Sequence, residues 1–170
     1  MKILMIISQN GFRDEELTEP KNILVNSGFK VVIASPKKGK CQGSKGLVVE
    51  SFVSIDEVVF EDYAGAFIVG GPDSPSLMSY SKIRDLMSFM NNNERVFGAI
   101  CLGPMVLASF GVIDGRTCTV YPSSEAKEMF RKHNVVFIEK NVVVDGNLVT
   151  ANGPHAATEF REMIVKLLGA

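Results

Sequence analysis

Cysteine and histidine are scarce in this sequence, and neither is arranged as a metal site or a disulfide framework requires. The chain has three cysteines, Cys41, Cys101 and Cys118, and two histidines. No two cysteines form a C-x-x-C pair or another spacing typical of zinc ligands or disulfides. We therefore expect no metal, no cofactor and no disulfide, and we expect the reducing environment of the cytoplasm.

Long apolar runs and an excess of one charge are also missing. The formal net charge is −1, and the basic residues are spread along the chain, which argues against a nucleic-acid partner. The longest apolar runs have the length of strands, so we expect no membrane-spanning segment. The first eight residues are too short for a signal-peptide core and lead directly to Asp14, Glu15 and Glu16, which favours a first strand.

The composition that remains is that of a globular protein. With 170 residues, 46% of them hydrophobic and 22% charged, the chain is long enough to bury a full core. No linker, repeat or low-complexity tract interrupts it. We therefore predict a single domain over residues 1–170.

Apolar strands alternate with helical patterns over the first 110 residues. Such alternation predicts an α/β fold with a parallel sheet and helices on both of its faces. The pattern predicts strands at 2–8, 30–35, 66–69, 95–100 and 117–121, a loop at 37–46, a hairpin formed by 142–144 and 148–151, and helices at 15–26, 81–92, 104–110, 124–132 and 156–168.

The segment RVFGAICLGPMVLASF, residues 95–110, is the most informative part of the chain. A short apolar strand leads to Cys101, and Pro104 suits the first turn of a following helix. Small residues, Ala99 and Gly103, stand two positions before and after the cysteine, as a nucleophile elbow requires. The amino end of the helix would then favour a thiolate on Cys101. The alternative is a cysteine that serves only as a small buried residue.

Two other predicted strands also end in unusual turns. Gly11 follows the first strand, and Gly70-Gly71-Pro72 follows the strand at 66–69. Ligands of parallel sheets collect beyond the carboxyl ends of the strands. We therefore expect these two turns and the Cys101 turn to meet in one crevice.

These residues resemble the ThiJ/PfpI family, which includes the parkinsonism-associated protein deglycase and the PfpI intracellular peptidases. The resemblance extends over essentially the whole chain. It is carried by Glu16 with Pro20 four residues later, IVGGP at 68–72, AICLGP at 99–104, GRTCTVYP at 115–122 and VVVDGNLVTANGP at 142–154.

The resemblance implies a flavodoxin-like three-layer sandwich with a mostly parallel sheet and a hairpin near the carboxyl terminus. It also implies a homodimer or higher oligomer, and a nucleophilic Cys101 with Glu16 beside it. The backbone amides of Gly71 and Leu102 would form an oxyanion site. The expected lining of the pocket is Gly70, Tyr121, Pro154 and His155, although His155 has a surface position at the start of the last helix as its alternative.

The chemistry of Glu16 follows from its expected neighbour. A carboxylate and a thiolate within hydrogen-bonding distance do not both ionise cheaply, so Glu16 should hold a proton and share it with Cys101. This would make Glu16 a proton donor and acceptor near neutral pH. Without such a neighbour, Glu16 would be an ordinary first-turn acid that stabilises a helix.

The sequence also departs from the family pattern. PfpI-type peptidases have a histidine directly after the nucleophilic cysteine, where this chain has Leu102, and a glutamate beyond the Gly-Gly pair, where it has Pro75 with Asp73 nearby. The ThiJ branch has a histidine where this chain has Tyr121. His133, at the end of a predicted helix, and His155 are the only histidines that remain.

Three functions are compatible with these residues. The first is a glyoxalase- or deglycase-like enzyme in which Cys101 attacks a small reactive carbonyl, or its adduct on a protein or peptide, and Glu16 moves the proton. The second is a redox-responsive or chaperone-like stress protein without turnover, in which Cys101 is oxidised to a sulfinate. A PfpI-type peptidase is the third, and the missing histidine argues against it. All three depend on Cys101.

Overall fold

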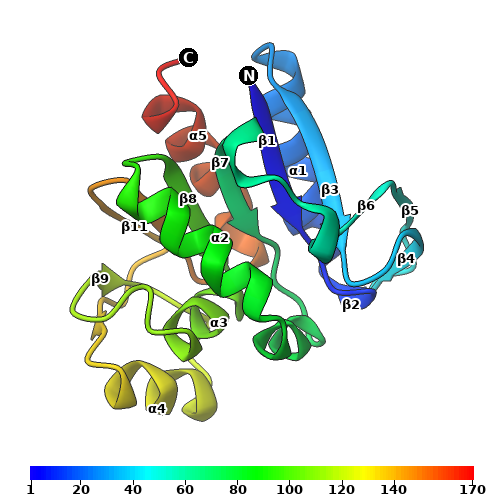
Figure 1. Ribbon diagram of the computed structural model, residues 1–170. Helices are drawn as coiled ribbons and strands as arrows, with labels where there is room; N and C mark the ends of the chain where they lie inside the picture. The colour runs from blue at the N-terminus through cyan, green and yellow to red at the C-terminus, as the bar shows by residue number, and fades with distance from the viewer.

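The computed structural model describes residues 1–170, and its centre is a seven-stranded sheet (Figure 1). The strand order is β11-β12-β8-β7-β1-β3-β6, and all neighbours are parallel except the hairpin β11/β12. The strands are β1 (Lys2–Ile6), β3 (Lys30–Ser35), β6 (Val53–Ser54), β7 (Tyr63–Ile68), β8 (Val96–Ile100), β11 (Val142–Asp145) and β12 (Leu148–Ala151).

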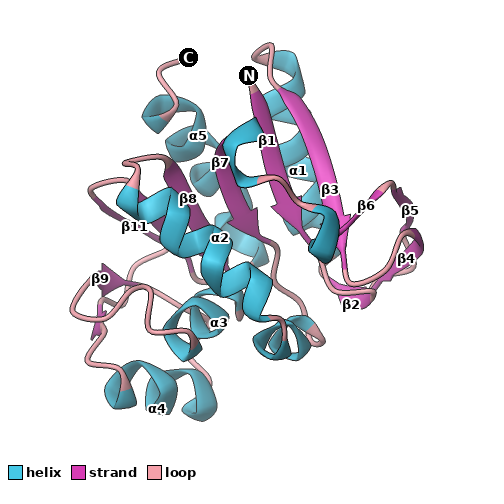
Figure 2. Cartoon of the chain, viewed as in Figure 1, coloured by secondary structure: helices cyan, strands magenta, loops and turns pink.

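Helices cover both faces of this sheet (Figure 2). The helix α2 (Ser81–Asn92) crosses in front of the sheet in this view, with α3 (Gly103–Ser109) and α4 (Ser124–Lys132) below it. Behind the sheet lie α1 (Asp14–Asn26) and α5 (Ala157–Leu167), which pack against each other. The predicted three-layer α/β sandwich is confirmed.

Each face of the sheet has its own hydrophobic core. On the α2 face, Ile83, Leu86 and Met87 are buried against sheet residues such as Leu4 and Ile68. The core on the opposite face is formed by Leu24 of α1, by Phe160 and Ile164 of α5, and by Phe67 and Ile100 of the sheet. Both faces of the central strands are therefore dry, which explains why these strands are continuous apolar runs instead of alternating patterns.

A second, small sheet corrects one sequence prediction. Residues 37–46 were expected to form a loop, but Gly39–Gly43 is a strand, β4, which pairs with β2 (Asn10–Phe12) and β5 (Val48–Ser51). The residues Cys41 and Gly43 are buried, whereas Lys40 and Gln42 are exposed. The glycines and lysines obscured this alternation in the sequence. Cys41 is thus a buried core residue and not a loop residue.

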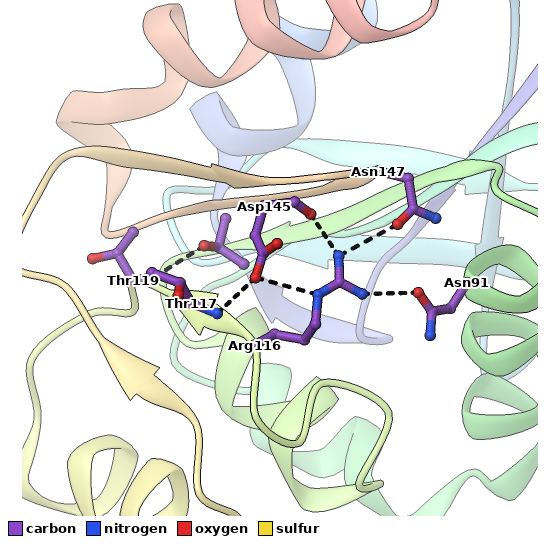
Figure 3. A network of polar contacts seen from close by, with 7 residues as sticks. Asn91, Arg116, Thr117, Thr119, Asp145 and Asn147 are labelled. Carbon is purple, nitrogen blue, oxygen red and sulfur yellow. Dashed lines mark hydrogen bonds and ion pairs between the residues drawn. The ribbon is translucent and has the colours of Figure 1, made fainter.

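A polar network around Arg116 connects the hairpin β11/β12 to α2 (Figure 3). Its guanidinium donates to Asn91 Oδ1 at 2.9 Å and to the backbone oxygen of Asp145, and it lies 3.3 Å from the Asp145 carboxylate. That carboxylate also accepts the backbone N–H of Thr117 at 2.8 Å. Arg116 therefore joins α2, β9 (Thr117–Cys118) and the hairpin β11/β12. β9 is shorter than the predicted strand at 117–121, and it pairs in parallel with β10 (Val136–Phe137).

The sheet order places three strand ends next to one another. β8, β7 and β1 are consecutive neighbours in the sheet, and all three are parallel. Their carboxyl ends lead to Cys101, to Gly70-Gly71 and to Gly11, respectively.

None of the helices has both the length and the apolar composition that crossing a bilayer demands.

Candidate functional site

Cys101 occupies a strained turn between β8 and α3. Its φ is +62°, a left-handed conformation that is uncommon for a residue with a side chain and that is typical of a nucleophile elbow. A Cβ on Gly103 would lie 2.9 Å from Ala99 Cβ and 3.0 Å from Ile68 O. The turn thus brings its flanks into contact, which is the physical reason for small residues at both positions.

Hydrogen bonds from both sides hold the backbone of this turn. The N–H of Cys101 donates to Ala151 O at 2.9 Å, and its carbonyl accepts the N–H of Tyr121 at 2.8 Å. Ala151 belongs to β12, so the carboxyl-terminal hairpin supports the elbow directly. The strained conformation is therefore fixed by the surrounding structure.

The turn after β7 lies against both other turns. A Cβ on Gly70 would fall 2.5 Å from Cys101 Cβ and 2.5 Å from Glu16 Oε2, so both side chains occupy the space that a side chain at position 70 would need. Gly71 has a φ of +115°, and a Cβ there would lie 2.4 Å from Gly11 O and 2.5 Å from Arg13 N. Only glycine permits this close approach of the three strand ends.

Glu16 is a fully buried acid. It lies on α1 with 0% of its surface exposed, and neither carboxylate oxygen completes a hydrogen bond of full geometry within the chain. Burial raises its pKa from 4.5 to about 7, against partial opposition from Cys101, the Gly70 N–H and the positive charge of Arg13. The expected proton on Glu16 near neutral pH is consistent with this direction.

The sulfur of Cys101 is less acidic than the sequence suggested. Cys101 is 9% exposed, and burial followed by the negative charge of Glu16 raises its pKa to about 12. The N–H groups of Gly71 and Leu102 act on the sulfur in the opposite direction but do not outweigh burial. Desolvation disfavours the charged form of the sulfur, and it acts against the thiolate that the amino end of the short helix α3 favours.

The acid and the thiol form one coupled pair. Burial raises the pKa of both groups, to about 7 for Glu16 and to about 12 for Cys101, and each group influences the ionisation of the other. Around neutral pH the pair thus carries up to one negative charge. That charge can move to the sulfur when Glu16 takes the thiol proton.

A cavity of about 310 Å³ opens onto this pair. Its wall is formed by Arg13, Glu16, Gly71, Pro72, Cys101, Leu102, Tyr121 and Pro154. Tyr121 is 47% exposed, which places it at the mouth of the cavity. Six of the residues expected from the sequence therefore share one cavity: Glu16, Gly71, Cys101, Leu102, Tyr121 and Pro154.

Two expected lining residues lie elsewhere. His155 is exposed and outside the cavity wall, with its Nε2 3.3 Å from Asn141 Oδ1, because the 3₁₀ turn Pro154–Ala156 directs it outward. Gly70 lies behind Cys101 and Glu16 instead of lining the cavity. His133 is the C-cap residue of α4 and lies 3.4 Å from Asp114, and Cys118 is buried in the core. No group of three or more His, Cys, Asp and Glu side chains converges as a metal site would need.

Arg13 is the cavity residue that the sequence analysis missed. It is the N-cap residue of α1, and its backbone N–H donates to Gly70 O at 3.0 Å. The sequence offered one usable signal, because Arg13 lies three residues before Glu16, one turn away on a helix that begins at a strand end.

The fold and this elbow define a class: three-layer α/β proteins with a cysteine at a strand-to-helix turn and an acid from the first helix beside it. The model of the DJ-1/PfpI family matches residues 1–167. The chain belongs to the DJ-1/PfpI family.

Relatives and solved structures agree with this assignment. The chain is 39% identical to an uncharacterised protein of Methanocaldococcus jannaschii, over 98% of this chain and 82% of that protein. It is 33% identical to the deglycase PfpI of Pyrococcus furiosus, over 99% of both chains. A ThiJ/PfpI domain protein of Brachyspira murdochii has the same fold, with a TM-score of 0.93, 28% identity and coverage of 99% of this chain and 96% of that one. The structure of DJ-1beta from Drosophila melanogaster is also similar, with a TM-score of 0.89 and 26% identity. The match covers 99% of this chain and 91% of that one.

Proposed function

We propose that the protein is a cysteine-dependent enzyme that acts on small reactive carbonyl compounds, such as 2-oxoaldehydes, or on their adducts. Cys101 is the nucleophile in this proposal, and Glu16 is the proton shuttle. The observation that carries it is the burial of a carboxyl group, with a pKa of about 7, beside the thiol of a strained elbow. Burying such a carboxyl is costly, and strained backbone concentrates at functional sites.

The addition step needs only groups that line the cavity. The ionised Glu16 accepts the thiol proton of Cys101 while the sulfur forms a bond to the carbonyl carbon. The electron pair of the carbonyl bond moves to its oxygen, next to the N–H groups of Gly71 and Leu102 that act on the sulfur in the free protein. Glu16 then returns the proton to that oxygen, which gives a hemithioacetal.

The following steps balance without an external oxidant or reductant. In the hemithioacetal of a 2-oxoaldehyde, the proton on the former aldehyde carbon moves to the carbon of the neighbouring carbonyl, and the hydroxyl proton moves to the oxygen of that carbonyl, so the first carbon is oxidised and the second is reduced. The product is a thioester of a 2-hydroxy acid on Cys101. Water hydrolyses this thioester and regenerates the thiol, and Glu16 is placed to move both protons.

The size of the cavity and the relatives support this choice. A volume of about 310 Å³ is at the lower end of the range for ligand sites, which suits a small molecule. Several relatives at 30 to 33% identity are named deglycases, including the Pyrococcus furiosus protein. That name describes those proteins, and it supports carbonyl chemistry as the proposal for this one.

The alternatives are less well supported. A PfpI-type peptidase would need a histidine on the cysteine, but Leu102 stands there and His155 is turned outward. A redox sensor would also oxidise Cys101 as the thiolate, the form that burial of the thiol disfavours. Both alternatives use the sulfur, so the deciding measurement is turnover.

The test is the consumption of methylglyoxal, with lactate as the product measured. We expect Cys101→Ala to abolish turnover and Cys41→Ala, which removes a buried sulfur outside the cavity, to retain it. Thermal unfolding of both variants controls for their folding. Full turnover by Cys101→Ala, or cleavage of a fluorogenic peptide by the wild type with no lactate formed, would contradict the proposal.

A further inference from the structure

Arg13 gives the cavity its only basic side chain. Among the eight residues of the wall, Arg13 and Glu16 are the two that carry formal charges at neutral pH, and the remainder are glycine, proline, leucine, tyrosine and the thiol of Cys101. The charges of Glu15, Glu16 and Cys101 all raise the pKa of Arg13, with the Glu15 hydrogen bond as the largest cause. Arg13 therefore acts on the same space as the reacting pair.

Most of the guanidinium is free to bind a ligand. Its Nε donates to Glu15 Oε1 at 2.9 Å, and the structure contains no hydrogen bond from Nη1 or Nη2. The side chain is 29% exposed, so these terminal N–H groups are accessible at the cavity. Two parallel N–H donors are the arrangement that binds a carboxylate in bidentate geometry.

The nearby acidic side chains do not occupy the terminal N–H groups of Arg13. Glu15 occupies Nε only and is itself 34% exposed, so the pair is weak in solution. Asp14 accepts the backbone N–H groups of Lys45 and Leu47, and Asp73 accepts the hydroxyl of Ser76, so both are engaged away from Arg13. The remaining acid is Glu16, which holds a proton for much of the time near neutral pH.

We propose that Arg13 selects substrates that carry a carboxylate close to the reactive carbonyl, such as a 2-oxoaldehyde with a carboxylate substituent. The carboxylate would bind the terminal N–H groups of Arg13 while the carbonyl carbon meets Cys101. The inference rests on the proposed function for the reaction itself, but it concerns the charge of the ligand and can be tested without turnover.

Two alkylating reagents of nearly equal size provide that test. Iodoacetate carries a carboxylate and iodoacetamide a neutral amide, and both transfer a two-carbon unit to Cys101. We expect Arg13→Gln to lower the ratio of iodoacetate to iodoacetamide rates about fivefold, as removal of a positive charge a few Å from the reagent predicts. Arg13→Lys should give an intermediate ratio, because it keeps the charge but loses the fork. Peptide mass mapping assigns the label to Cys101.

A matched control removes a positive charge elsewhere. Arg84 on α2 is exposed, pairs with Asp85 and lies outside the cavity, so Arg84→Gln changes the net charge by the same amount. We expect its rate ratio to equal that of the wild type. An unchanged ratio in Arg13→Gln, or an equal fall in Arg84→Gln, overturns the proposal.

A second measurement does not require a reactive sulfur. Oxamate and oxamide differ by one negative charge and resemble a 2-oxo acid and its neutral amide. We expect oxamate to shift the NMR signals of Arg13 and Leu102 in the wild type, oxamide to bind at least fivefold more weakly, and Arg13→Gln to lose the preference. Equal binding of oxamate and oxamide to the wild type overturns the proposed selectivity. If the wild type prefers oxamate but does not turn over methylglyoxal, only the proposed reaction is rejected.

Discussion

Glu16 combines two properties that are rare for a glutamate, complete burial and carboxylate oxygens without a full hydrogen bond. Burial raises its pKa to about 7, so its ionisation falls in the range where most enzymes work. Cys101, with a pKa of about 12, supplies little thiolate by itself at neutral pH. Activation of the sulfur therefore depends on the ionised form of Glu16.

This dependence predicts the pH profile of the enzyme. Because the ionised carboxylate is the base, kcat/KM for methylglyoxal should rise as the pH increases through about 7 and then level off. Glu16→Gln removes the base, and we expect kcat/KM to fall by about 10² to 10⁴ and the step near pH 7 to disappear.

The control for this profile is another acid on the same helix. Glu19 accepts the hydroxyl of Thr158 and lies outside the cavity, so Glu19→Gln should keep both the rate and the step. A step near pH 7 that persists in Glu16→Gln would assign it to a different group.

At the scale of elements, the strand-to-helix turn depends on contacts across its own flanks. Gly103 begins α3, where helix propensity alone favours alanine over glycine. The structure predicts that alanine at this position destabilises the protein instead, because a Cβ on Gly103 would lie 2.9 Å from Ala99 Cβ and 3.0 Å from Ile68 O. Both neighbours are held by β8 and β7, so little relaxation is available.

We therefore expect Gly103→Ala to lower the free energy of unfolding by about 1 to 3 kcal/mol, the usual cost of overpacking. Urea denaturation followed by circular dichroism measures it. The activity should fall as well, because Leu102 and Cys101 precede the displaced residue. A variant as stable as the wild type would show that the turn opens freely and that the small residues have another cause.

The neighbouring elements stabilise this turn from a distance in sequence. The Arg116 network fixes the hairpin β11/β12 to α2 (Figure 3), and Ala151 of β12 accepts the N–H of Cys101. The elbow is thus held by strands on both sides of β8. Such support permits the strained φ of Cys101 to persist.

For the whole molecule, the buried acid links function to stability. The carboxyl of Glu16 has an ordinary pKa of 4.5 in the unfolded chain and about 7 in the folded one. Below pH 4.5 both states hold the proton, and its full contribution to stability is present. As the pH rises from 4.5 to about 7, the unfolded chain releases this proton while the folded chain keeps it, so the contribution is lost progressively and is absent above pH 7.

We expect this loss to be about 3 kcal/mol between pH 4.5 and 8, as a shift of this size implies. Glu16→Gln does not titrate, so the difference in unfolding free energy between variant and wild type should grow in favour of the variant as the pH rises. Urea denaturation at pH 5 and pH 8 measures that difference. Parallel pH curves for the two proteins would show that Glu16 has its ordinary pKa in the folded state.

Much of the fold followed from the sequence because it is encoded locally. Apolar runs of strand length gave β1, β3, β7 and β8, and the turn at Asp145-Gly146-Asn147 gave the hairpin. Helix boundaries at α1, α2 and α4 were predicted to within one residue, and the capping residue Ser123 marks the start of α4. The strand β4 was missed, because it forms by pairing with β2 and β5 on its two sides and not through its own composition.

The sequence by itself determined the elbow, its small flanking residues and the meeting of three strand ends, because spacing and parallel order dictate them. Only the tertiary structure decided how acidic Cys101 is, that His155 turns outward and that Arg13 lines the cavity. These properties depend on which groups from β8, α1 and the loops become neighbours, and on how much water remains between them. Burial and proximity arise only when elements distant in sequence pack together, so no local pattern encodes them.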